Sequence, residues 1–254
     1  MKNKLLISLL ALLMPLVSHA AIINVYFAGG QSNATEEWRD GIIEQLHEKD
    51  PSAVVVWATH GGTALHEWYT GYEYEETIGR QSLYLKDFYN PDLSETGLLE
   101  TAFHDLTEQG DTPVLSGLFW FQGETDQYIE ESHVDDRYYH DFLAFRDAIK
   151  EDFKAPNLPV SLAVVYEGPR GGPVRPGLQS IRDQQFALGL LPDIFAYDTI
   201  DLERYTDYNI YLTNEVARQT GREMVMGLPV AIPEVSSLGL LLSGCFVVIY
   251  WRFR

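Results

Sequence analysis

The chain has 254 residues and a net charge of −19, because 18 lysine and arginine residues face 37 aspartate and glutamate residues. Such an excess of acidic groups repels phosphate, which argues against nucleic acid and anionic lipid head groups as partners. The one cysteine, Cys245, lies close to the C-terminus. We therefore expect no disulfide, thiol nucleophile or cysteine metal site in the body of the chain.

Residues 1–20 have the pattern of a secretory signal peptide. Lys2 and Lys4 precede an apolar run over residues 5–17, and small residues lead up to Ala20. This pattern predicts cleavage after Ala20 and export of the chain across the inner membrane.

Residues 232–254 form a second special segment. A Pro-Glu pair at Pro233 precedes an uncharged, mostly apolar stretch over 236–251, and Arg252 and Arg254 follow it. As a helix this stretch spans roughly 24 Å, enough for one membrane helix with a cytoplasmic C-terminus. The segment resembles the PEP-CTERM sorting tail, which implies processing by an exosortase. A plain C-terminal anchor is the alternative, and both place the body at the cell surface or in the extracellular matrix.

Residues 21–231 are predicted to form one α/β domain. Short apolar runs typical of buried strands alternate with stretches that have helical periodicity. The predicted strands cover 22–28, 53–58, 114–121, 159–165 and 194–197, and the predicted helices cover 35–50, 98–109, 135–153, 177–188 and 213–226. This alternation predicts a three-layer α/β/α sandwich with a mainly parallel, five-stranded sheet.

The sequence places Ser32 on a tight turn between the first strand and the first helix. Gly29 and Gly30 end the strand, and a helical pattern begins at Thr35. Backbone N–H groups at such a helix start can stabilise a developing oxyanion beside the serine hydroxyl. The alternative is that Ser32 only caps the helix.

Two further polar turns are predicted at the same edge of the sheet as Ser32. Residues 60–63 follow the second strand and residues 122–126 follow the third, and ligands of open α/β sheets bind at the carboxyl ends of strands. A glycine of the second turn, Gly62 or its neighbour, can supply a second oxyanion N–H group. The amide of Gln122 is a further candidate donor.

The segment 66–91 is rich in aromatic residues, among them Trp68. Aromatic faces can pack against the C–H faces of sugars, so the segment is a candidate substrate-binding loop. The alternative is that these rings cover the edge of the sheet as a satellite of the core.

Four motifs carry a resemblance that spans residues 22–226. They are Gly30–Ala34, Gly61–Thr63 with Trp68, Trp120–Asp126 and Ile181–Gln185. Together they resemble the sialate O-acetylesterase and carbohydrate esterase family six branch of the SGNH hydrolases, which have a flavodoxin-like fold. Members remove acetyl groups from sugars by a serine mechanism without a metal or other cofactor. The resemblance thus implies an acetylated sugar or polysaccharide as substrate.

The same resemblance implies roles for individual residues. Ser32 would be the nucleophile, Glu124 would orient the base, and the oxyanion hole would consist of the Ser32 N–H, a glycine N–H near Gly62, and Gln122. The residues predicted to contact or brace the substrate are Gln31, Asn33, Trp68, Arg182 and Gln185.

The catalytic base is the point at which this sequence departs from that family. Tyr211 stands where the family has a histidine, and no histidine follows His140. A tyrosine with a pKa near 10 is a poor base at neutral pH. Three interpretations stay open: His60 is the base, Glu124 or Asp207 acts directly as a weaker base, or the site no longer turns over and the domain binds surface or matrix polysaccharide.

Overall fold

The computed structural model describes residues 20–68, 97–127, 137–166, 176–205 and 211–229. Its five strands form one parallel sheet in the order β2-β1-β3-β4-β5. The strands are β1 (Ile22–Gly30), β2 (Val54–Thr59), β3 (Thr112–Phe121), β4 (Val160–Val164) and β5 (Ile194–Asp198). The helices are α2 (Glu36–His47), η1 (Leu65–Trp68, a 3-10 turn), α4 (Leu98–Glu108), α6 (Arg137–Asp152), α7 (Pro176–Leu188) and α8 (Asn214–Gly227).

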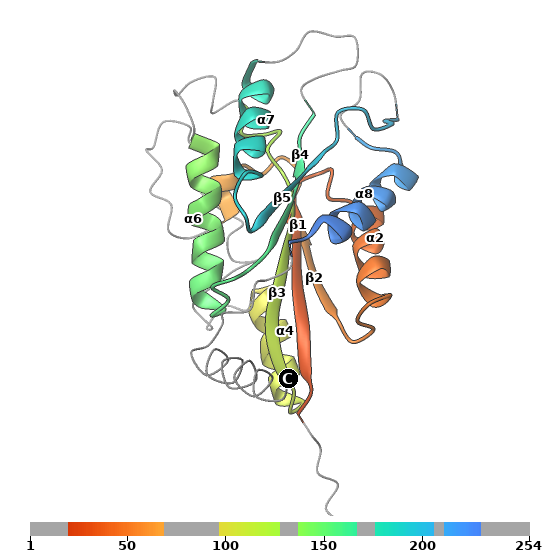
Figure 1. The fold of residues 1–254 in the computed structure, drawn as a ribbon, viewed down its shortest axis with the longest axis vertical. Coiled ribbons are helices and arrows are strands. Elements are labelled where there is room, and N and C mark those ends of the chain that lie inside the picture. The colour runs from red at the N-terminus through yellow and green to blue at the C-terminus, as the bar shows by residue number, and fades with distance from the viewer. Residues whose placement is uncertain (1–19, 69–96, 128–136, 167–175, 206–210, 230–254) are drawn as a thin grey trace, which may run out of the picture.

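The predicted α/β/α sandwich with a parallel five-stranded sheet is confirmed. Helices α6 and α7 cover one face of the sheet and helices α2 and α8 cover the other (Figure 1). Each face has its own cluster of buried apolar side chains, so the sheet is the middle layer of three. The carboxyl half of β1 and all of β4 are buried, as strands with helices on both sides must be.

Helices α2 and α8 pack closely enough that their backbones touch. Gly41 and Gly221 make this contact possible: a Cβ on Gly41 would lie 2.0 Å from the Arg218 carbonyl oxygen, and one on Gly221 would lie 2.2 Å from the Trp38 carbonyl oxygen. The start of α2, which follows the Ser32 turn, is therefore held against α8 as well as against the sheet.

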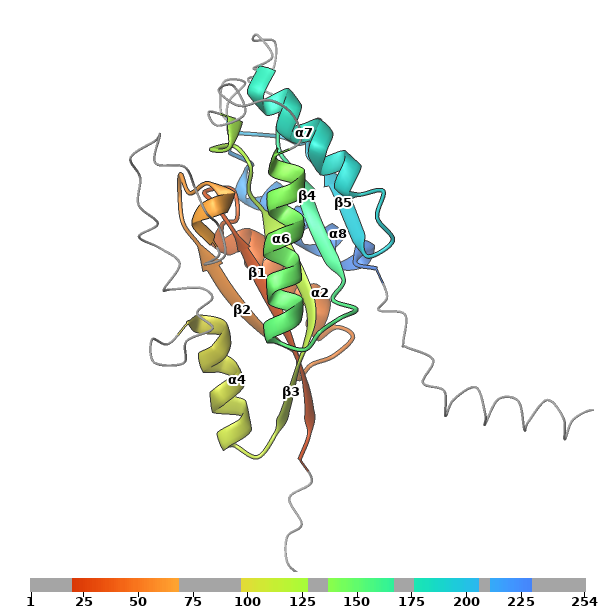
Figure 2. The same ribbon diagram turned by 90° about the vertical axis from the view of Figure 1, so that its left-hand side faces the viewer.

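Three strands end level with one another at the carboxyl edge. Gly30 at the end of β1 pairs with Thr59 of β2 on one side and with Phe121 of β3 on the other. The turns after these strands therefore start side by side, as the parallel topology requires. Figure 2 shows α4 beside the amino-terminal end of β3, at the other end of the sheet from these turns.

Several sequence predictions fall outside the described residues. They are the signal peptide before residue 20, the tail after residue 229, most of the aromatic segment 66–91, and Asp207. Within the described ranges, no helix is long and apolar enough to span a membrane.

Candidate active site

Ser32 lies on a tight turn that is fixed to both neighbouring segments. The Gln31 N–H donates to the Phe121 carbonyl oxygen at 3.0 Å, and the Ala34 N–H donates to the Gln31 carbonyl oxygen at 2.8 Å. The cap of α2 is Thr35, whose side chain accepts from the Trp38 N–H at 3.3 Å. Because the cap is three residues further on, capping does not account for Ser32, whose side chain is half-buried.

Gly30 allows the turn to begin where it does. Its φ is +150°, and a Cβ at this position would lie 2.0 Å from the Phe121 carbonyl oxygen. Only glycine fits both the backbone conformation and this close approach to β3. The glycine that the sequence marks as the end of β1 is thus the residue that brings Ser32 over the sheet edge.

The turn after β2 lies against the Ser32 turn. The His60 N–H donates to the Gly30 carbonyl oxygen at 3.0 Å, and a Cβ on Gly61 would lie 4.0 Å from the Ser32 Cβ. Gly62 has φ +74°, a conformation that favours glycine. The backbone of Gly61 is therefore placed next to the serine, as a second oxyanion donor would need to be.

His60 is held by the same turn. Its Nδ1 lies 2.8 Å from the Thr63 Oγ1, and Thr63 is only 2% exposed. A hydroxyl partner at Nδ1 fixes the orientation of the ring. The structure thus places His60 at the edge that carries Ser32.

Asn33 and Glu124 form a buried hydrogen bond between the Ser32 turn and the turn after β3. The Asn33 Nδ2 donates to the Glu124 Oε1 at 2.7 Å. Burial raises the pKa of Glu124 above its ordinary value, and the bond from Asn33 opposes this rise. The other carboxylate oxygen, Oε2, is buried and has no hydrogen-bond partner among the described residues.

Gln122 holds the turn over residues 60–63 in place. Its side chain is fully buried, and its Nε2 donates to the Thr63 carbonyl oxygen at 3.0 Å and to Asp126. An amide nitrogen has two hydrogens, so these two bonds use both donors. Asp126 in turn accepts from the Leu65 N–H at 3.0 Å, which fixes the start of η1.

Arg182 and Gln185 brace the edge from α7. The Gln185 side chain accepts from the Val165 N–H at 2.7 Å and donates to the Gln122 carbonyl oxygen at 2.8 Å. Arg182 donates to the Val165 carbonyl oxygen at 3.0 Å and to both carboxylate oxygens of Asp198 at 2.6 Å. Both side chains are at least 95% buried, so they hold the ends of the strands in place.

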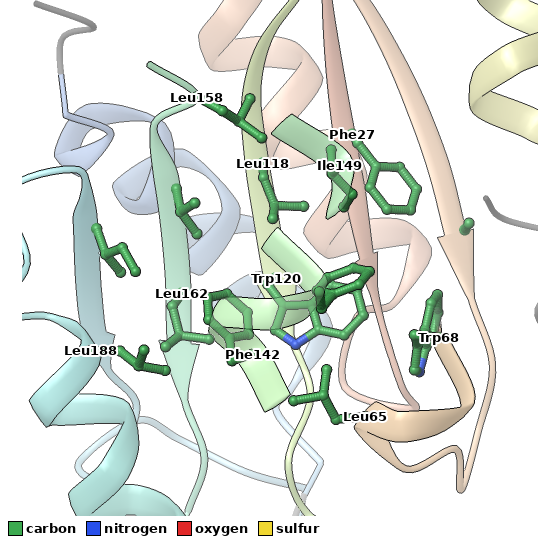
Figure 3. Close-up of a cluster of buried hydrophobic side chains, with 14 of the residues drawn as sticks. Phe27, Leu65, Trp68, Leu118, Trp120, Phe142, Ile149, Leu158, Leu162 and Leu188 are labelled. Atoms are coloured by element: carbon green, nitrogen blue, oxygen red, sulfur yellow. The ribbon is translucent and has the colours of Figure 1, made fainter. Parts of the chain in front are cut away.

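The remaining residues predicted to contact substrate are also buried. Gln31 is 2% exposed, and its Oε1 accepts from the Thr125 N–H at 3.4 Å. Trp68 is 1% exposed and packs edge-to-face against Trp120, with 4.8 Å between ring centroids. Figure 3 shows these two rings beside Leu65 within the apolar cluster. This structure therefore places Trp68 in the core rather than on an open surface.

Tyr211 is next in sequence to a residue that contacts the Ser32 turn. The next residue, Leu212, donates its N–H to the Asn33 Oδ1 at 3.4 Å. Tyr211 is 40% exposed, and its carbonyl oxygen accepts from the Tyr205 N–H at 3.3 Å. The segment that carries the histidine in the family resembled above is thus present here, with tyrosine in its place.

Sequence reasoning did not identify three residues that build this edge. Asp126 belongs to the motif Trp120–Asp126, so the motif could have indicated it, although not its contact with the Leu65 N–H. Tyr138, whose hydroxyl donates to the Gln122 carbonyl oxygen at 3.0 Å, looks in sequence like one more core aromatic. Arg204 lies 3.8 Å over the Tyr166 ring and acts electrostatically on Glu124, and no sequence pattern indicated this.

The carboxyl edge brings several functional groups together. Among the described residues, no group of three or more His, Cys, Asp or Glu side chains could hold a metal ion. What they do bring together is a serine on a tight turn, glycine backbone beside it, an imidazole at the same edge and a buried carboxylate.

Comparisons with known proteins agree with this fold. A family model described as carbohydrate esterase, sialic acid-specific acetylesterase, matches residues 37–228. No curated protein matches the chain. A carbohydrate acetylesterase from Xanthomonas citri is 17% identical, with a TM-score of 0.54, over 80% of this chain and 55% of that one. A protein from Arabidopsis thaliana is also 17% identical, with a TM-score of 0.52, over 80% of this chain and 96% of that one.

Proposed function

We propose, because this chain belongs to the sialic acid-specific acetylesterase family of carbohydrate esterases, that it is an exported O-acetylesterase that hydrolyses acyl esters on sugars through Ser32. The Ser32 Oγ would attack the acyl carbonyl carbon, and the sugar would leave as an alcohol after it takes up a proton. Water would then hydrolyse the acyl-serine and regenerate the hydroxyl. No cofactor enters these steps.

The observation that carries this proposal is the position of Ser32. The family match begins after Ser32, at residue 37, so the role of the serine rests on geometry. Ser32 lies on a turn whose backbone is fixed by Phe121, it is not the cap of α2, and Gly61 lies against its Cβ. A half-buried serine on a tight turn with glycine backbone beside it suits acyl transfer, because backbone N–H groups at such a turn can bind the developing oxyanion.

The neighbouring residues take supporting roles in this proposal. The N–H groups of Ser32 and of the Gly61–Gly62 turn would bind the oxyanion. Gln122, predicted from sequence as a third donor, uses both amide hydrogens on Thr63 and Asp126. We assign it the task of holding the glycine turn in shape.

The base is assigned to His60, with Glu124 as a buried carboxyl group next to the Ser32 turn. His60 is at the correct edge, and Thr63 orients its ring. A neutral imidazole can accept the serine proton at neutral pH, which a tyrosine at position 211 cannot do efficiently. Asp207, which lies outside the described residues, and Glu124 remain the alternative, weaker bases.

The ends of the chain fit an exported protein. Residues 1–20 would be removed on export, and residues 232–254 would hold the protein in the membrane until an exosortase-type enzyme processes them. The acetylated sugar would then be met at the cell surface or in the extracellular matrix.

One observation favours a second function. Leu212 is anchored to Asn33, which brings the neighbouring Tyr211 toward the site at the point where a catalytic histidine would be needed. A domain that kept the pocket and lost the base would bind surface or matrix polysaccharide without turnover.

The test is acetate release by the full chain and by its Ser32→Ala and His60→Ala variants, with acetylated xylan and O-acetylated sialic acid as substrates. The proposal expects release that disappears with Ser32→Ala and falls by about 10²-fold or more with His60→Ala. Equal background release from all three proteins would contradict it and favour the binding function.

A further inference from the structure

Helices α6 and α7 enclose a second surface feature that the esterase proposal does not use. The two helices lie side by side over the sheet (Figure 2), and between them is a groove of about 1000 Å³. Its size is at the upper end of the range typical of small-molecule sites, about 300–1000 Å³. Its lining includes Tyr139 and His140 of α6 and Gln179, Asp183 and Gln184 of α7.

One wall of the groove carries planar polar groups in fixed orientations. The Gln179 Nε2 donates to the Asp183 Oδ1 at 2.7 Å, and the Gln184 Nε2 donates to the Ser180 Oγ at 3.1 Å. The Gln184 Oε1 also accepts from the Tyr139 N–H at 2.8 Å, so the exposed pair of Gln179 and Asp183 is the one that presents a donor and an acceptor side by side along α7. Neighbouring hydroxyl groups on a sugar ring match such an arrangement, because each hydroxyl can both donate and accept.

The groove also has apolar surface of the kind that faces sugar rings. Leu190 at the end of α7 is 86% exposed. On α6, the rings of Tyr139 and His140 are perpendicular, with 5.4 Å between centroids. Aromatic and aliphatic surfaces of this kind pack against the C–H faces of sugars.

The charge of the groove selects among ligands. Its lining as described contains Asp183 but neither lysine nor arginine, and the chain as a whole has a net charge of −19. Asp183 and the net charge of the chain would repel an anionic ligand, and no lysine or arginine among the described lining residues offsets this, so the ligand that fits is neutral and rich in hydroxyl groups.

On both helices, a residue that lines the groove is the sequence neighbour of a residue that braces the candidate active site. The residue before Tyr139 is Tyr138, and the residue after Gln184 is Gln185; both donate to the Gln122 carbonyl oxygen, at 3.0 Å and 2.8 Å. Helices α6 and α7 follow β3 and β4 along the chain, so their first turns lie toward the carboxyl edge of the sheet. We propose that the groove binds an unesterified stretch of a neutral polysaccharide whose acetylated ring lies at Ser32. The proposal rests on the proposed function for its substrate class.

The test measures binding of a sugar that has no ester. The full chain is titrated with xylohexaose and with sialyllactose by isothermal titration calorimetry. The double variant Gln179→Ala/Asp183→Ala removes the polar pair of the groove from a helix in which alanine is well tolerated. The matched control is Gln219→Ala/Glu223→Ala, which removes the same type of pair, with a 2.6 Å bond, from α8 on the other face of the sheet.

We expect xylohexaose binding that is at least 5-fold weaker in the groove variant and unchanged in the α8 variant. Equal affinity of the wild type and the groove variant would overturn the proposal, as would stronger binding of sialyllactose than of xylohexaose. Self-association that the groove variant abolishes, without any sugar binding, would assign the groove to a second copy of the chain and also overturn it. Because the ligand carries no ester, failure here is distinct from failure of the esterase proposal, which acetate release by the Ser32→Ala variant decides.

Discussion

Asn33→Ala tests whether the buried bond between the Ser32 turn and Glu124 stabilises an ionised carboxylate. Asn33 is 3% exposed, and its Nδ2 donates a hydrogen bond to the Glu124 Oε1 at 2.7 Å. Glu124 already has one buried oxygen without a described partner. After the substitution, both oxygens would be buried without a described hydrogen bond.

The expected cost is about 1.5–3 kcal/mol of unfolding free energy at pH 8, the usual range for a buried hydrogen bond to a charged group. Its pH dependence follows from the shifts described above. Burial raises the pKa of Glu124 and the bond from Asn33 lowers it, so the variant has a still higher pKa. A raised pKa in an acid makes the folded state less stable as the pH rises, so the loss caused by Asn33→Ala must grow between pH 5 and pH 8.

The assay is urea denaturation of both proteins at pH 5 and at pH 8, with Asn24→Ala as the matched control. The Asn24 side chain also donates to a carboxylate, that of Asp50, at 2.8 Å, but Asp50 is near the surface. The bond from Asn24 lowers the pKa of Asp50, so this carboxylate is ionised over the whole range and the control loss should not vary with pH. A loss in Asn33→Ala that is equal at both pH values would refute the argument, because the substitution would then not change the protonation of Glu124 between pH 5 and pH 8.

Three further predictions concern packing, titration and chemistry. Gly221→Ala should lower the free energy of unfolding by roughly 1–3 kcal/mol, because the added Cβ would lie 2.2 Å from the Trp38 carbonyl oxygen; a gain in urea denaturation, as helix propensity alone predicts, would contradict the α2–α8 contact. Glu124→Gln removes a buried acid with a raised pKa, so between pH 5 and pH 8 its unfolding free energy should fall less with pH than that of the wild type; parallel curves would refute this. In the His60→Ala background, Tyr211→His should raise hydrolysis of p-nitrophenyl acetate about 10-fold or more, and Ser32→Ala added to it should abolish the gain; a gain that survives the loss of Ser32 would be unrelated to the site.

The layers of the fold were predictable because apolar periodicity dictates them. The run 22–28 and the helical pattern from Thr35 predict β1 and α2, and the structure has them at Ile22–Gly30 and Glu36–His47. The 3-10 turn η1 was not predicted. It depends on the Asp126 carboxylate at the Leu65 N–H, a contact between residues distant in sequence.

In the candidate site too, features set by neighbouring residues were predictable and features set by distant contacts were not. Glycines at a strand end predict a turn, so the position of Ser32 follows from local sequence. Burial is a property of the assembled fold, and for that reason a motif cannot distinguish an aromatic side chain that faces substrate from one in the core. Trp68, predicted to contact a sugar, packs on Trp120 instead. The hydrogen bonds of Gln122 to Thr63 and Asp126 were hidden for the same reason.

The backbone around Tyr211 makes its substitution a direct test of how much chemistry the site has kept. Residues 203–205 and 211–213 pair with each other: the Thr213 N–H donates to the Glu203 carbonyl oxygen at 3.3 Å, and Arg204 forms a bridge with Leu212. The Leu212 N–H then reaches the Asn33 Oδ1. These contacts are made by backbone atoms and by Asn33, so they do not depend on the side chain at position 211. A histidine there would change the acid–base chemistry without moving the segment, and the size of the gain in the His60→Ala background would measure how well position 211 can carry the base.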